Sequence, residues 1–142
     1  MEPTVMKDEK LSAEMNSDAK ATVVRGQIIL FEYDGQLLMK RVIAVGGDTI
    51  EGKDLQIFLD GKVVAEPYVE HIGKRPLGRK YLEEFDPVKV PPGQLFVAGD
   101  NRDYSHDSRD YVFGLIPLED VRGKPIEIVW SPVSSRVGTR IR

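Results

Sequence analysis

The chain has 142 residues, a length that suits one ordinary domain or one core carrying a small insertion. With 41% hydrophobic and 30% charged residues, the chain can form a packed core and keep a soluble surface, so its composition excludes general disorder. The formal net charge of −3 argues against nucleic acid as a partner, and the absence of cysteine excludes disulfides, thiolate metal sites and a cysteine nucleophile.

Short runs rich in Val, Ile, Leu and Phe, separated by 13 glycines and 9 prolines, favour a mostly β fold over a helical bundle. Near the start, residues 5–15 fit a short helix and a strand with a loop about equally well. Strands are then expected at residues 23–31, 36–45, 55–59, 62–65, 94–98 and 126–130. Asp34-Gly35 and Asp60-Gly61 each predict a tight hairpin turn, because Asp-Gly supplies the positive φ angles that such turns need.

Two other segments look irregular. Residues 66–92 are charged and weakly periodic and contain five prolines, so they predict an extended, loop-rich excursion that fits an inserted lobe. Residues 131–142, with Ser, Gly, Thr and Arg, predict a fraying terminus. No apolar run approaches the roughly 18 residues of a membrane span, and residues 1–4 do not read as a signal peptide. We therefore expect a soluble fragment, with any membrane attachment outside these residues.

Lys40 is a candidate for chemistry because of its place in an expected strand. Alternation puts it on the same face as Leu38, Val42 and Ala44. Burial against apolar neighbours would lower the pKa of its amine from about 10.4, by up to several units, and would make it a usable general base near neutral pH. The strand pattern by itself also fits a lysine that reaches past the sheet edge into water.

A dense polar run, residues 99–109 (Gly-Asp-Asn-Arg-Asp-Tyr-Ser-His-Asp-Ser-Arg), directly follows an expected apolar strand. Taken alone, it fits a solvated loop with local turns and ion pairs. Its adjacent Ser, His and Asp do not predict a catalytic triad, because neighbours in sequence seldom converge on one reacting atom. His71 and His106 belong to no ligand-spaced cluster, so no metal site is expected. Gly46-Gly47 fits a turn better than a phosphate-binding loop.

Four blocks carry a family resemblance. They are residues 1–4 (Met-Glu-Pro-Thr), 25–31 (Arg-Gly-Gln-Ile-Ile-Leu-Phe), 40–48 (Lys-Arg-Val-Ile-Ala-Val-Gly-Gly-Asp) and 99–109. Together they resemble bacterial type I signal peptidase (leader peptidase), a membrane-anchored family of Ser/Lys-dyad proteases. The first block resembles the end of that family's Ser-Met-x-Pro-Thr motif, and the last matches Gly-Asp-Asn-Arg-x-x-Ser-x-Asp-Ser-Arg at every specified position. Gln27 in place of an acidic residue, and Ala44-Val45-Gly46 in place of Gly-x-Pro, depart from the pattern.

The resemblance implies a fold and a division of the chain. It implies a mostly antiparallel β catalytic core of the signal peptidase type, made of residues 1–52 and 93–142. Residues 53–92 would form a small inserted β and loop cap lobe. No cofactor is implied.

The resemblance also implies roles for single residues. The nucleophile would be the serine immediately before Met1, which is not in this sequence. Lys40 would be the general base, and Ser105 would orient its nitrogen. Two ion pairs would support the last motif against the lysine strand, namely Asp107 with Arg109 and Asp100 with Arg41.

The substrate implied by the resemblance is the C-terminal end of a secretory signal peptide. It would bind extended along a strand edge, with small side chains in shallow pockets walled by Met1, Leu38 and Met39. The intact protein would process exported preproteins at the outer face of the cytoplasmic membrane, held there by an anchor outside this sequence.

Two other functions stay open at this point. The chain could be a non-catalytic relative of the same fold that binds extended peptides or a partner protein, since it does not contain the motif serine. It could also resemble the self-cleaving SOS repressors, which use a related Ser/Lys core. Residues 99–109 fit signal peptidase better than those repressors.

Overall fold

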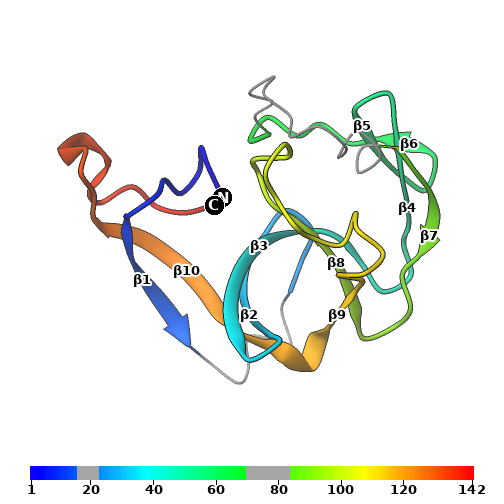
Figure 1. The fold of residues 1–142 in the computed structure, drawn as a ribbon, viewed down its shortest axis with the longest axis horizontal. Helices are drawn as coiled ribbons and strands as arrows, with labels where there is room; N and C mark the ends of the chain where they lie inside the picture. Colours follow the sequence, from blue (N-terminus) through cyan, green and yellow to red (C-terminus); the bar gives the residue numbers. More distant parts are fainter. Residues whose placement is uncertain (16–22, 70–83) are drawn as a thin grey trace.

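The computed structural model describes residues 1–15, 23–69 and 84–142, which form two antiparallel β-sheets (Figure 1). The larger sheet has the strand order β1-β10-β2-β3-β8-β9, and the smaller has the order β6-β5-β4-β7. The larger sheet consists of β1 (Lys10–Met15), β2 (Ile28–Tyr33), β3 (Gln36–Val45), β8 (Gln94–Ala98), β9 (Ile116–Pro117) and β10 (Val121–Trp130). The smaller sheet consists of β4 (Thr49–Lys53), β5 (Gln56–Leu59), β6 (Lys62–Val63) and β7 (Phe85–Lys89). The mostly antiparallel β fold is therefore confirmed.

Helices play almost no part in the described residues. Two short 3₁₀ helices, η3 (Leu118–Asp120) and η4 (Ser134–Arg136), precede and follow β10. No helix in residues 1–15, 23–69 and 84–142 is long and apolar enough to cross a lipid bilayer.

Both Asp-Gly hairpin turns are confirmed. Asp34 and Gly35 join β2 to β3 with φ angles of 48° and 71°, and Asp60 and Gly61 join β5 to β6 with φ angles of 48° and 76°. A third two-residue turn, 54–55, joins β4 to β5 with φ angles of 51° and 64°. Its second residue is leucine, which rarely adopts a left-handed backbone, so the sequence did not predict this turn.

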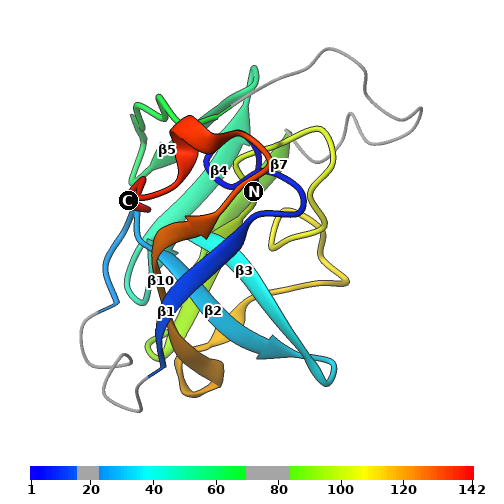
Figure 2. The ribbon, with the colours of Figure 1, turned by 90° about the vertical axis from the view of Figure 1, so that its left-hand side faces the viewer.

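The expected strand ends agree with the structure best at the centre of the larger sheet. The expected strands 36–45 and 94–98 coincide with β3 and β8. β2 begins later than expected because residues 25–26 form a turn, in which Gly26 has a φ of 83°. β10 begins earlier than expected and pairs with both β1 and β2, so these strands lie side by side with β3 (Figure 2). The ambiguous segment near the start contains a strand, β1.

The region expected to be loop-rich contributes a strand to the smaller sheet. β7 lies at the edge of that sheet and pairs with β4, which was not among the expected strands. Pro87 has no N–H to donate. It is tolerated in β7 because one side of an edge strand has no neighbouring strand to pair with. Residues 70–83 of the same region lie outside the described residues.

Two apolar clusters form the core. The first is formed mainly by strands of the larger sheet and contains Ile29, Phe31, Val42, Leu95, Val97, Phe113, Ile116 and Val121. The second joins β3 and β8 to the smaller sheet and contains Ile43, Ala44, Ile50, Ile57, Leu59, Val90, Phe96 and Ala98. Since β3 and β8 contribute to both clusters, they hold the two sheets together.

The C-terminal residues 131–142 do not fray, so that expectation was wrong. They fold back over β10, where the N–H of Ile128 donates to the carbonyl of Thr139 at 3.0 Å. Arg136 pairs with Glu9 at 2.6 Å between Nε and Oε1. A polar tail can be ordered in this way when an exposed strand edge supplies main-chain partners.

Candidate active site

Lys40 lies on β3, one residue before β8 begins to pair with that strand. Val42 belongs to the first core cluster and Leu38 packs against it. Alternation predicts this, because both residues share a face of β3 with Lys40. Ala44 instead packs in the second cluster, because the β3–β8 register shifts between Val42 and Ala44. The expectation for Ala44 was therefore wrong, and the bulge is the reason.

Ser105 holds the end of the Lys40 side chain. Nζ of Lys40 donates to Oγ of Ser105 at 2.7 Å, and the N–H of Gly99 donates to the same oxygen at 3.1 Å. A Cβ atom at Gly99 would lie 2.3 Å from Oγ of Ser105, so only glycine allows this approach. The loop after β8 thus brings Ser105 onto a lysine that is 65 positions away in the chain.

Asp107 and Arg109 form a buried ion pair beneath Ser105. Nε and Nη2 of Arg109 donate to the two carboxylate oxygens of Asp107 at 2.8 and 3.0 Å. The Asp107 side chain is 0% exposed, and Oδ2 also accepts from the N–H of Gly99 at 2.9 Å. The pair therefore fixes the same glycine that contacts Ser105.

The environment of Lys40 favours the neutral amine. Burial lowers the pKa of Lys40 from its ordinary value of 10.5; the Asp107 carboxylate opposes this effect, and the charge of Arg109 adds to it. The amine consequently accepts and releases a proton at lower pH than a solvated lysine does. Of the two readings that the sequence allowed for Lys40, the structure supports burial, since the residue is half-buried and its nitrogen donates to Ser105.

The next residue on β3, Arg41, anchors the other end of the loop. Its Nε and Nη2 donate to the two oxygens of the buried Asp100 at 2.8 and 2.7 Å. The hydroxyl of Thr4 also donates to Asp100. Arg41 further donates to a main-chain oxygen of Arg142 at 2.9 Å, so the Arg41–Asp100 pair contacts both Thr4 and Arg142. Both expected ion pairs are present.

Two hollows flank Lys40. One, of about 460 Å³, is lined by the N-terminal segment including Met1, together with Met39 and Lys40. The other, of about 440 Å³, is lined by Leu38, Met39 and Lys40 and by the rings of Tyr33, His106 and Phe113. The three expected wall residues therefore all border hollows that Lys40 shares.

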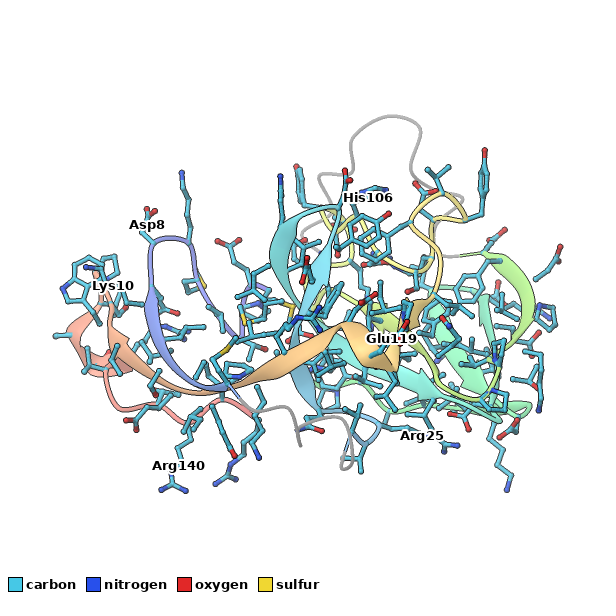
Figure 3. All side chains as sticks on the ribbon, turned by 90° about the horizontal axis from the view of Figure 1, so that it is seen from below. Asp8, Lys10, Arg25, His106, Glu119 and Arg140 are labelled. Carbon is cyan, nitrogen blue, oxygen red and sulfur yellow. The ribbon has the colours of Figure 1, made fainter. Side chains whose placement is uncertain are left out.

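The remaining candidates have other hydrogen-bond and ring partners, although His106 lines the second hollow with Lys40. Nε2 of His106 lies 3.5 Å from Asp110 and its ring meets the edge of Phe113, so it does not form a triad with the serines beside it. Figure 3 shows His106 and Arg25 projecting from opposite faces of the molecule. Oγ of Ser108 accepts from the N–H of Val97 at 3.0 Å, which is a structural contact.

Possible metal ligands do not gather in the described part of the chain. Residues 1–15, 23–69 and 84–142 contain no group of three or more His, Cys, Asp or Glu side chains placed to hold a metal ion. His71 lies outside the described residues. Gly46 and Gly47 form the turn from β3 to β4, as the sequence predicts.

Sequence reasoning missed three polar residues that contact this region. Thr4 donates to Asp100, and Glu66 and Tyr68 contact arginines of the last motif and of β3. Thr4 belongs to the first motif block, which was the available signal. Glu66 and Tyr68 lie in a charged stretch with only weak periodicity, so no local pattern distinguished them from their neighbours.

Comparison with known proteins gives consistent matches. A sequence model of the family described as "Signal peptidase, peptidase S26" matches residues 1–130. Signal peptidase I V of Bacillus subtilis strain 168 is 39% identical over 130 residues, which cover 87% of this chain and 76% of the relative. Signal peptidase I of Bacillus amyloliquefaciens is 36% identical over 125 residues, which cover 87% of this chain and 67% of the relative.

A solved structure supports the same assignment. The crystal structure of a signal peptidase I from Enterococcus faecalis V583 superposes with a TM-score of 0.62 at 30% identity, covering 72% of this chain and 96% of that chain. The likeness therefore extends from sequence to fold. The resemblance read from the motif blocks is confirmed, and the chain belongs to the signal peptidase family, peptidase S26.

Proposed function

We propose that this chain is the catalytic region of a signal peptidase I, a Ser/Lys-dyad endopeptidase that removes signal peptides from exported preproteins. The observation that carries the proposal is the 2.7 Å contact between Nζ of Lys40 and Oγ of Ser105, beside the hollow lined by Met1. A desolvated amine held by one hydroxyl is suited to act as a base near neutral pH. The nucleophile is a serine directly before Met1, which would enter the same hollow.

The proposed reaction has two steps. In acylation, Lys40 accepts the hydroxyl proton while the serine oxygen attacks the carbonyl carbon of the scissile bond. Lys40 then returns that proton to the leaving nitrogen, the C–N bond breaks, and an acyl-enzyme ester remains. In deacylation, Lys40 accepts a proton from the attacking water and passes it to the departing serine oxygen. Lys40 ends the cycle in the state in which it began.

Ser105 orients the amine of Lys40. A neutral amine that donates one N–H to Oγ of Ser105 keeps its lone pair free on another side of the nitrogen. Gly99 and Asp107 both hydrogen-bond to the Ser105 side chain and fix its position. The lone pair of the Lys40 nitrogen therefore does not rotate freely. Arg41 with Asp100, and Arg109 with Asp107, hold the loop that carries this contact.

The substrate is proposed to bind along β3. Residues 36–40 pair with β2 on one side, while pairing with β8 on the other side begins only at Arg41. An extended peptide can bind such an edge through its main chain and place alternate side chains in adjoining hollows. Met1, Leu38 and Met39 would then contact the small side chains at the end of the signal peptide.

Location and domain division complete the proposal. The catalytic region would act at the extracytoplasmic side of the cytoplasmic membrane, with a membrane anchor outside these residues. Residues 1–52 and 93–142 would form the catalytic core, and residues 53–92 the cap lobe. Orientation of the hollows towards the membrane surface would bring the cut site of an exported preprotein within reach.

The direct test compares three proteins on a synthetic signal-peptide substrate. They are this chain, a version extended upstream through a serine directly before Met1, and the same extension with alanine in place of that serine. We expect cleavage by the serine version alone, because the other two lack the nucleophile. Absence of cleavage by all three, with each shown to be folded and able to bind the peptide, would favour the non-catalytic peptide-binding relative.

The pH dependence of cleavage should report Lys40. Because its pKa lies below the ordinary 10.5, the neutral, proton-accepting amine is populated at lower pH than in a free lysine. The value of kcat should fall as the pH drops through this lowered pKa and should level off above it. The measurement is a kcat profile of the serine version, and an acid limb centred at 10.5 would contradict the assignment.

A further inference from the structure

The segment after β6, residues 64–69, contacts the polar loop of residues 99–109 through a buried ion pair. The Glu66 carboxylate accepts from Nη1 and Nη2 of Arg102 at 2.9 and 2.6 Å. The two side chains are 9% and 5% exposed, so the pair is almost removed from solvent. A two-point contact of this kind fixes the plane of the guanidinium group.

Tyr68 completes the contact. Its hydroxyl donates to Oε1 of Glu66 at 3.0 Å, and its ring lies 3.9 Å from Cζ of Arg41. Burial, followed by the Glu66 carboxylate, raises the pKa of Tyr68, so the phenol stays protonated and continues to donate. A turn closed by the N–H of Val69 and the carbonyl of Glu66 at 3.0 Å brings both side chains to the same side.

The contact continues to the lysine through Gly99. Nε of Arg102 donates to the carbonyl of Gly99 at 3.1 Å, and the N–H of Gly99 donates to Oγ of Ser105 at 3.1 Å. Ser105 in turn accepts from Nζ of Lys40 at 2.7 Å. An unbroken series of hydrogen bonds thus connects Glu66, which follows the smaller sheet, with Lys40 in the larger one.

We propose that Glu66 and Tyr68 are positioning residues, which hold Arg102 and Arg41 so that the Gly99 loop keeps Ser105 against Lys40. The proposal rests on the proposed function, since positioning of Lys40 affects rate only if Lys40 is the base. Without Glu66, the buried guanidinium of Arg102 loses both of its hydrogen bonds to that carboxylate and is drawn towards water. The Gly99 carbonyl then loses its donor, and the contact between Ser105 and Lys40 loosens.

The first readout needs no catalysis and uses the chain as it stands. We expect Glu66→Ala to speed hydrogen exchange of the Gly99 amide by about tenfold or more, because its loop opens locally. The amide of Val42 donates to the main-chain carbonyl of Gln27 at 2.9 Å and is the internal reference. Its exchange rate should be unaffected. The matched control is Glu32→Ala, which removes an exposed ion pair with Arg122, 2.8 Å between Nη2 and Oε2.

The second readout uses the serine-bearing chain. Glu66→Ala should lower kcat by about tenfold or more with little change in KM, because misplacement of a reacting group acts on the chemical step. Glu66→Gln keeps an oxygen acceptor for Arg102 and should recover part of the loss. Glu32→Ala should leave kcat unchanged. If the alanine variant folds poorly, the glutamine variant carries the same comparison at smaller amplitude.

Each outcome decides the proposal. Unchanged Gly99 exchange in Glu66→Ala and Glu66→Gln would overturn it, whatever the activity. Faster exchange together with an unchanged kcat per folded molecule would also overturn it. A serine-bearing parent that cleaves nothing contradicts the proposed function instead, and the exchange of Gly99 then decides alone whether Glu66 holds this loop.

Discussion

Replacing Lys40 with methionine in the serine-bearing chain should lower kcat by about 10²- to 10⁴-fold, the range that a positioned proton-transfer group contributes. Methionine is similar in length and tolerates the half-buried position on β3, but its thioether does not accept the serine proton. The hollows that receive the peptide keep their other walls, so KM should change much less. Steady-state kinetics on a synthetic signal peptide measure both quantities.

Two further variants calibrate that result. Lys53→Met removes an exposed lysine from β4 and should leave kcat unchanged. Ser105→Ala keeps the amine but removes its hydrogen-bond partner, so we expect a smaller loss of about 2- to 10-fold, since a hydrogen bond between neutral groups contributes about 0.5–1.5 kcal/mol. Full activity of the Lys40→Met enzyme would exclude Lys40 as the general base.

The largest effect on stability is expected for Asp107→Asn. The substitution removes the carboxylate charge opposite the buried Arg109, whose side chain is 1% exposed. Breaking a buried pair by neutralising one partner typically costs about 3–5 kcal/mol, because the other charge stays buried without compensation. Urea unfolding at neutral pH measures the loss, and Asp86→Asn on the exposed edge of β7 is the matched control.

The same carboxylate should make stability depend on pH. Burial alone would raise the pKa of Asp107, but the charge of Arg109 and hydrogen bonds from Arg109, Ser105 and Gly99 outweigh it, so the pKa lies below 3.8. The resulting stability is fully present above 3.8 and is lost as the pH falls through the lower value of the folded protein. Asp107→Asn should abolish this part of the acid sensitivity.

Equal unfolding free energies for Asp107→Asn and the parent at neutral pH would contradict the buried-pair argument.

Local patterns were sufficient where neighbouring residues decide the structure. Asp34-Gly35 and Asp60-Gly61 form the expected turns because their backbone preferences act within two residues. The turn of residues 54–55 escaped notice because it places a leucine at positive φ, where sheet pairing on both sides must outweigh the local preference. The local sequence of residues 10–15 did not distinguish a helix from a strand. They form a strand because β10 supplies their main-chain hydrogen-bond partners.

The sequence by itself determined that this chain is a mostly β protein, and its motif blocks determined the family. It also singled out Lys40 and Ser105, by resemblance to that family. Only the tertiary structure decided that the two side chains meet, that Lys40 is desolvated, and that Glu66 and Tyr68 contact the same network. The physical reason is that turns and alternation depend on neighbours in sequence, whereas burial and charge pairing depend on which strands lie side by side. Lys40 and Ser105 are 65 positions apart, and sheet pairing and loop packing bring them together.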